Sequence, residues 1–139
     1  MPDSPKARNA LRYLAFYAMA AEVIDLAVRN TRVLARSAVS AMRSGEAAPD
    51  NLTEAVRDLA RSAEALAVQL EEPARATGTG HFALEAAGEA TTALVKRNDL
   101  ETNMLVGQVR STAVDLLQAS GMDSETASDA LDGAVNGAA

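Results

Sequence analysis

The sequence contains no cysteine, no tryptophan and a single histidine, and it has only two tyrosines and two phenylalanines among its 139 residues. Without cysteine the chain forms neither a disulfide framework nor a thiolate nucleophile, which agrees with a reducing compartment. The single histidine, His81, follows a glycine-containing stretch and has no matched carboxylates near it. We therefore expect an ordinary helix-start residue at this position rather than a metal ligand or a catalytic base.

Other signatures of chemistry are also missing from the sequence. No glycine-rich phosphate loop follows a strand-like segment, and no nucleophile elbow occurs. We predict a protein that is not an enzyme and that uses no metal and no cofactor.

Basic charge and long apolar runs are scarce as well. The formal net charge is -6 and the pI is about 4.7, which argues against nucleic acid as a partner, because neutralising phosphates requires a basic face. No stretch reaches the roughly 18 uncharged apolar residues that a membrane span needs. We expect a chain that is soluble as given and does not insert directly into a membrane.

What the sequence does contain is helical periodicity, above all in a first helix predicted over 5–43. Ser4 followed by Pro5 is a good helix opening, and Gly45 suits the residue that closes the helix. At 100° per residue a charged strip falls on one side, formed by Glu22, Asp25, Arg29, Arg32, Arg36 and Arg43. The opposite face is apolar and comprises Tyr13, Phe16, Tyr17, Ala20, Ile24, Ala27, Thr31, Leu34, Ala38 and Met42.

Three shorter helices are predicted over 51–72, 80–97 and 99–120, and the pattern allows a short fifth helix over 124–135. Asn51 and Asn98 each precede a glutamate by three residues, which predicts capping boxes at the second and fourth helices. We assign 73–80 to a loop because of its two glycines, and we attribute Gly88 to a close helix crossing. The second helix carries a bundle seam of Leu52, Val56, Leu59, Ala63, Leu66 and Leu70.

These segments predict an all-α fold, an antiparallel four-helix up-and-down bundle that forms a single domain over residues 1–139. The first helix is nearly twice as long as the others, so its N-terminal part needs a cover. That cover is either the C-terminal segment or a second copy of the chain. Tyr13, Phe16 and Tyr17 are the candidate interface residues.

One candidate binding site involves Arg110, which falls at the edge of the apolar seam of the fourth helix. In one interpretation Arg110 is structural and forms an ion pair with Asp25 on the first helix. In the other, Arg29, Asn30 and Arg110 line an anion-binding crevice between the first and fourth helices.

Two stretches resemble a known family. The segment LRYLAFYAMAAEVIDLAVRNTRVLARSAV spans 11–39, and ETNMLVGQVRSTAVDLLQASG spans 101–121. Both are similar to the C-terminal cytoplasmic region of FUSC-family integral membrane proteins of high-GC Gram-positive bacteria, which are relatives of the fusaric acid resistance and aromatic acid exporters. The phrases VRNTRVLAR and QVRSTAVDLL carry most of the likeness.

The resemblance implies a piece of a longer membrane protein that lies on the cytoplasmic face of the plasma membrane, after transmembrane helices that this chain lacks. We accordingly expect a non-catalytic domain that serves self-association or regulation of the membrane part, with that parent transmembrane region and a second copy of the chain as partners. The alternative is a sensing bundle that binds an aromatic or amphipathic acid beside Arg29 and Arg110.

Overall fold

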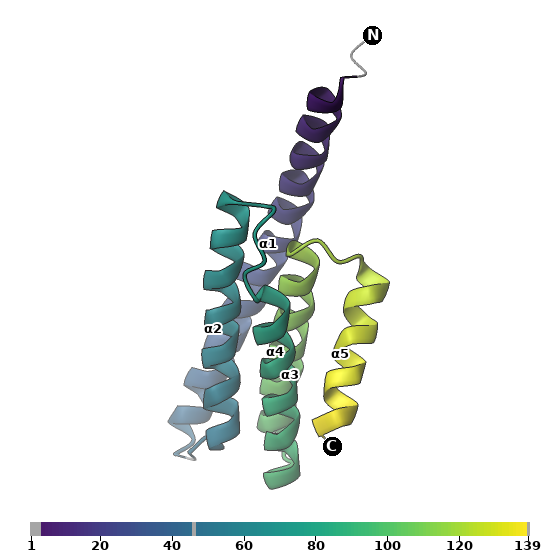
Figure 1. The fold of residues 1–139 in the computed structure, drawn as a ribbon. Coiled ribbons are helices and arrows are strands. Elements are labelled where there is room, and N and C mark those ends of the chain that lie inside the picture. The colour runs from purple at the N-terminus through teal and green to yellow at the C-terminus, as the bar shows by residue number, and fades with distance from the viewer. Residues whose placement is uncertain (1–3, 46, 139) are drawn as a thin grey trace.

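The computed structural model describes residues 4–45 and 47–138, which form five helices and contain no strand (Figure 1). The helices are α1 (Pro5–Arg43), α2 (Asp50–Glu71), α3 (Thr79–Lys96), α4 (Leu100–Ala119) and α5 (Ser124–Ala138). The predicted all-α helical bundle is confirmed. The limits of the first four helices differ from the predicted ones by at most one residue, and α5 continues three residues beyond its predicted end.

Helix α4 lies at the centre of the bundle and contacts the other four helices. The most extensive pairings are α2 with α3 and α1 with α4, whereas α1 and α2 are not a packed pair although they follow each other in the chain. Helix α5 packs on α3 and α4, on the side away from α2 (Figure 1). The bundle is therefore closed by α5 on one side and open between α1 and α2 on the other.

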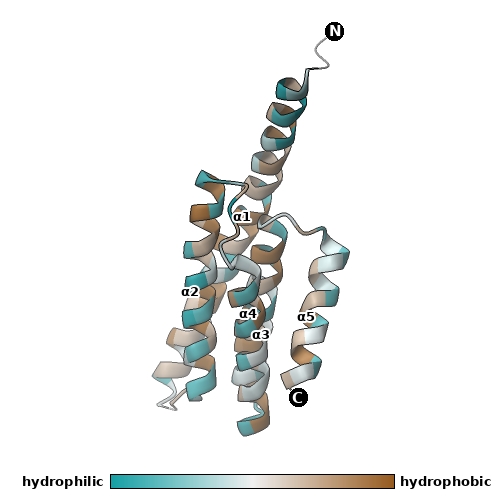
Figure 2. Ribbon diagram, viewed as in Figure 1, coloured by the Kyte–Doolittle hydropathy of each residue, from teal (hydrophilic) through white to brown (hydrophobic). Residues whose placement is uncertain are grey.

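The core is built from small side chains, as the scarcity of aromatic residues requires. Helix α3 contributes fully buried alanines, and the predicted apolar face of α4 is buried along its whole length. These residues belong to one core cluster, and Figure 2 shows apolar positions recurring along the helices of the bundle. The α3 residues are Ala83, Ala86, Ala87, Ala90 and Ala93, and the α4 residues are Leu105, Val106, Val109, Ala113, Leu116 and Leu117. Such small side chains let the helix axes approach closely.

The helix starts agree with the sequence at α1 and differ at α2 and α4. Ser4 caps α1 by accepting a hydrogen bond from the backbone N–H of Ala7 at 3.2 Å. The predicted cap at Asn98 is wrong, because Asp99 caps α4 and accepts from the N–H of Thr102 at 2.8 Å.

The predicted cap at Asn51 is also wrong. Its side-chain amide donates to the carboxylate of Glu89 on α3 at 2.7 Å, and Pro49 stands at the cap position without a side-chain hydrogen bond. The Asn51 side chain therefore bonds to Glu89 on the neighbouring helix instead of capping the backbone of its own helix. Asn51 thus joins α2 to α3.

Glycines end two of the helices, and another lies where two helices pack together. Gly45 and Gly121 close α1 and α4 with φ of 79° and 116°, in the left-handed region that favours glycine. Gly88 lies where α5 crosses α3, since a Cβ placed there would lie 3.8 Å from the Cβ of Ala138. A second helix does pack at Gly88, but at ordinary van der Waals distance, so the crossing there is not close enough to require a glycine.

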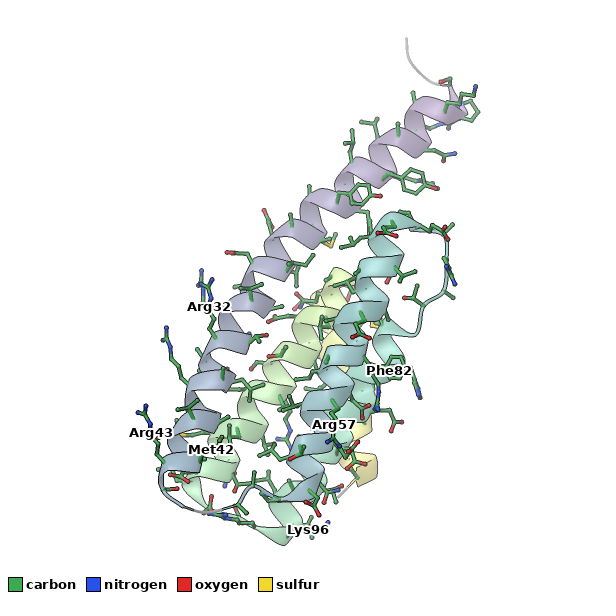
Figure 3. All side chains as sticks on the ribbon, turned by 90° about the vertical axis from the view of Figure 1, so that its left-hand side faces the viewer. Arg32, Met42, Arg43, Arg57, Phe82 and Lys96 are labelled. Carbon is green, nitrogen blue, oxygen red and sulfur yellow. The ribbon has the colours of Figure 1, made fainter. Side chains whose placement is uncertain are left out.

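Helix α1 buries a narrower strip than its sequence predicted. The buried residues are Ala20, Val23, Ala27, Leu34 and Ala41, whereas Met42 and Tyr13 of the predicted apolar face are exposed. The reason is that α1 packs chiefly on α4, so only one side of the helix is covered. The charged strip does point outward, as Figure 3 shows for Arg32 and Arg43.

Candidate functional site

An apolar groove of about 430 Å³ lies between α1 and α2. We call it the α1–α2 groove. Its floor is formed by Thr112 and Leu116 of α4. One wall is α1, with Ile24, Ala27, Val28, Thr31 and Leu34, and the other is α2, with Val56, Leu59, Ala60, Ala63, Leu66, Ala67 and Leu70.

The groove exists because α2 carries a wider apolar arc than its contact with α3 and α4 can cover. Leu52, Leu59 and Leu66 of the predicted seam are buried, as expected. Val56 and Ala63 of the same seam are exposed and line the groove. The sequence predicted the seam as one buried contact surface. In the structure Leu52, Leu59 and Leu66 are buried, whereas Val56 and Ala63 stay exposed in the groove.

Among the residues that the structure describes, no charged side chain lines the α1–α2 groove. The two hydroxyl groups of its lining are both bonded to their own helix: Thr31 donates to the carbonyl oxygen of Ala27 at 2.7 Å, and Thr112 to that of Gln108 at 2.8 Å. This lining therefore offers no charged partner to orient a carboxylate or a phosphate. Its chemistry is that of an uncovered helix-packing surface, which matches the apolar side of another helix.

Tyr17 closes one end of the groove. Its hydroxyl donates a hydrogen bond to the backbone carbonyl oxygen of Leu70 at 2.7 Å. Leu70 lies in the last turn of α2, where carbonyl groups have no partner within the helix. The ring of Phe16 meets that of Tyr17 edge-on, with centroids 5.6 Å apart. Of the three candidate interface residues, Tyr13 and Tyr17 are exposed and Phe16 is half-buried.

Beyond Tyr17, the first turns of α1 project past the rest of the bundle (Figure 1). We call residues 5–16 the α1 arm. Leu11 and Leu14 are 64% and 63% exposed there, and the C-terminal helix α5 packs on α3 and α4 instead of covering the arm. The expectation that the C-terminal segment covers this part of α1 is therefore wrong.

The residues of the predicted anion crevice are only partly brought together. Asn30 and Arg110 line one shallow pocket between α1 and α4, but Arg29 does not. Arg29 faces solvent and lies 3.9 Å from Asp25. Arg110 does not reach Asp25 either, because one of its terminal nitrogens donates to the hydroxyl of Thr91 on α3 at 2.9 Å.

Sequence reasoning assigned no role to Asp115 in this pocket. Its carboxylate accepts a hydrogen bond from the side-chain amide of Asn30 at 2.6 Å. Burial raises the pKa of Asp115, and the bond from Asn30 opposes that rise only in part. The signal available in the sequence was its position between Val114 and Leu116, within an apolar stretch of α4. A negatively charged ligand would meet this carboxylate beside Arg110.

The described residues form no metal-binding cluster and no membrane-spanning helix. Among these residues no group of three or more acidic or histidine side chains is arranged to hold a metal ion. No helix there is both long enough and apolar enough to cross a bilayer. His81 is exposed in the first turn of α3, and its ring centroid lies 5.5 Å from that of Phe82.

No protein-family model, curated protein or solved structure matches this chain. The surfaces of the molecule itself are therefore the guide to its function. The α1 arm and the α1–α2 groove are uncovered apolar surfaces that involve the same helix, and Val95 and Leu100 are exposed near the opposite end of the bundle.

Proposed function

We propose that this chain is a non-catalytic association domain of a FUSC-like membrane transporter. It lies on the cytoplasmic face of the membrane and serves self-association or regulation of the membrane part through α1. The observation that carries the proposal is the exposure of large apolar side chains on the α1 arm, with Leu11, Leu14 and both tyrosines open to solvent.

The arm continues a helix that is already formed on the bundle, so it needs no nucleation of its own. Its residues are nevertheless mostly exposed and gain little from tertiary packing. The arm has 12 residues by its bounds, and Lys6, Arg8 and Arg12 are its only charges. A partner surface that covers Leu11 and Leu14 stabilises the arm and removes their apolar area from water.

The transporter part of the proposal is supported by how the two family-like phrases pack. VRNTRVLAR is residues 28–36 of α1, and QVRSTAVDLL is residues 108–117 of α4. These two helices are a packed pair, and the hydrogen bond from Asn30 to Asp115 joins one phrase to the other. The resemblance therefore coincides with a structural unit and not with two unrelated surface segments.

A sensor of aromatic acids has weaker support. The described lining of the groove carries no charged partner for an acid, and the pocket beside Arg110 contains the carboxylate of Asp115. An acid bound there would have to overcome repulsion from that group.

Sedimentation over a wide range of protein concentrations tests the association. We expect the wild-type chain to associate as its concentration rises, and we expect the double variant Leu11→Ser/Leu14→Ser to associate more weakly. The matched control is Val95→Ser/Leu100→Ser, which removes two equally apolar side chains, 75% and 76% exposed, near the opposite end of the bundle. A wild-type chain that stays monomeric at every concentration contradicts self-association.

The membrane context is tested by the gene itself. We expect the reading frame on the N-terminal side of this segment to encode several transmembrane helices. Deleting residues 1–139 from that longer protein should leave it in the membrane and change its oligomeric state or its export activity. A frame that encodes no membrane helix on either side contradicts the transporter assignment.

A further inference from the structure

The α1 arm and the α1–α2 groove share one face of α1, on which Lys6 is the one charged residue between Pro5 and Leu34. Residues on this face recur at intervals of three, four or seven, so they lie above one another along the helix. They begin on the arm and continue into the groove, and they are Tyr13, Tyr17, Ile24, Val28 and Thr31. On the arm this face is represented by Tyr13 and Tyr17, whereas Leu11 and Leu14 lie towards the charged strip of α1.

The lengths of the two features match. The arm spans 12 residues, which corresponds to about 18 Å of helix. The α1 wall of the groove runs from Ile24 to Leu34, which corresponds to about 16 Å. The α2 wall runs from Val56 to Leu70, which corresponds to about 22 Å. An arm-sized helix therefore extends along most of the groove.

The charges of the two features are complementary. Lys6, Arg8 and Arg12 give the arm three positive charges, and no acidic residue occurs between Ser4 and Glu22. The formal net charge of the chain is -6, so the residues outside the arm are acidic as a group. The two helices that form the groove carry exposed acidic residues at Asp25, Glu64 and Glu71, together with the exposed cations Arg32 and Arg57. Opposite charges of this kind favour one orientation of a docked helix and speed its encounter with the groove.

We propose that the arm of one copy lies along the α1–α2 groove of a second copy, and that the second copy returns the same contact. This inference rests on the proposed function and names its partner. The exchange is reciprocal because arm and groove share one helix: a two-fold axis that passes beside α1, perpendicular to it and level with residues 17–21, places each arm over the other copy's groove. Such an interface is closed and produces a dimer, not a filament.

The residues near this axis suit a close approach of two helices. The stretch between arm and groove contains Ala18, Ala20 and Ala21, and Ala18 and Ala21 are exposed. Small side chains let two helix axes come near the lower end of the usual range of 8–10 Å. A small-molecule occupant is less well matched, because the hydroxyls of Thr31 and Thr112 already donate within their own helices.

The absence of cysteine from the sequence allows a direct test by cross-linking. Two single-cysteine variants are mixed and oxidised, Ala10→Cys on the arm and Ala63→Cys in the groove. We expect a disulfide-linked heterodimer in this mixture. The matched control replaces Ala63→Cys with Ser128→Cys, at an exposed serine on α5, and should give little product.

The other outcomes separate this inference from the proposed function. If Ala10→Cys links chiefly to itself, the arms pair with each other, which overturns the inference but leaves self-association standing. Equal yields from the mixtures with Ala63→Cys and Ser128→Cys likewise overturn it. A chain that gives no cross-link and sediments as a monomer contradicts both statements.

A charge exchange tests the contact without a cross-linker. Arg12→Glu places a negative charge on the arm, and we expect it to weaken dimerisation about tenfold. The double variant Arg12→Glu/Glu64→Arg should recover most of the loss. The control Arg36→Glu has the same charge change on the outer side of α1 and should have a smaller effect. If Arg12→Glu and Arg36→Glu weaken dimerisation equally, the arm does not contact the groove.

Discussion

The hydroxyl of Tyr17 donates a hydrogen bond to the backbone carbonyl oxygen of Leu70 at 2.7 Å, and this bond joins α1 to α2 at the end of the groove. Elsewhere these two helices are separated by the groove above α4. The bond therefore marks the boundary on α1 between the part that lies on the bundle and the part that projects from it. It also gives a partner to a carbonyl in the last turn of α2.

Removing this hydroxyl should loosen the end of α2. We expect Tyr17→Phe to lower the free energy of unfolding by about 0.5–1 kcal/mol, because one exposed hydrogen bond is lost while the ring remains. Hydrogen exchange of the α2 amides near Leu70 should become faster. Tyr13→Phe is the matched control, since no described residue bonds its hydroxyl. Equal effects of the two variants would contradict a role for the Leu70 contact.

Two glycines of the fourth helix region should respond to alanine in opposite directions. A Cβ at Gly107, inside α4, has no atom within 4 Å, so Gly107→Ala should stabilise the chain by about 1 kcal/mol through helix propensity. Gly121 has φ of 116°, where an alanine is strained, so Gly121→Ala should destabilise it. Thermal unfolding of both variants checks the prediction, and a loss of stability in Gly107→Ala would contradict it.

The buried carboxyl of Asp115 should make stability fall as pH rises. Its pKa is raised by burial, so the native state holds this proton more tightly than the unfolded state does. The charged form is therefore disfavoured at neutral pH, where Arg110 is the one other charged residue among those described that line the pocket. We expect Asp115→Asn to be more stable than the wild type at neutral pH, with a difference that shrinks as the pH is lowered. A variant that is less stable at neutral pH would show that the Asn30 bond outweighs the cost of burial.

The carboxyl of Asp99 should make stability fall as the pH is lowered, the opposite of Asp115. The N–H of Thr102 and then the side chain of Arg97 lower the pKa of Asp99 from 3.8 to about 2. A lowered pKa contributes stability that is present above 3.8 and is lost as the pH falls towards 2. Asp99→Asn keeps a capping oxygen and removes the titration, so its unfolding curve should depend less on pH in this window. If the stability of Asp99→Asn falls with pH as steeply as that of the wild type, Asp99 does not have this role.

Much of the fold could be predicted from the sequence because helix signals here are local. Ser4 and Pro5 open α1, Gly45 and Gly121 close helices, and the apolar face of α4 is continuous. The predicted caps at Asn51 and Asn98 are wrong for physical reasons. Glu89 on another helix binds the first, and the neighbouring Asp99 has the better position for capping α4.

The candidate site was harder to predict, since periodicity shows that a face is apolar but not which neighbour covers it. Val56, Leu59, Ala63 and Leu66 share one spacing and all line the groove, yet Val56 and Ala63 are exposed whereas Leu59 and Leu66 are buried. Arg29 and Arg110 lie on packed helices but on different sides of their contact. Asp115 was given no role because its partner, Asn30, is 85 positions away in the chain.

The most direct test of the account is hydrogen exchange of the α1 arm as a function of protein concentration. In a monomer the amides of residues 8–16 have helical bonds but little packing, so they should exchange quickly. We expect these amides to become protected as the concentration rises, together with amides of α2 beside the groove, while those of α5 stay unchanged. Arm amides that exchange at the same rate at every concentration would contradict the claim that α1 is an interface between copies of this chain.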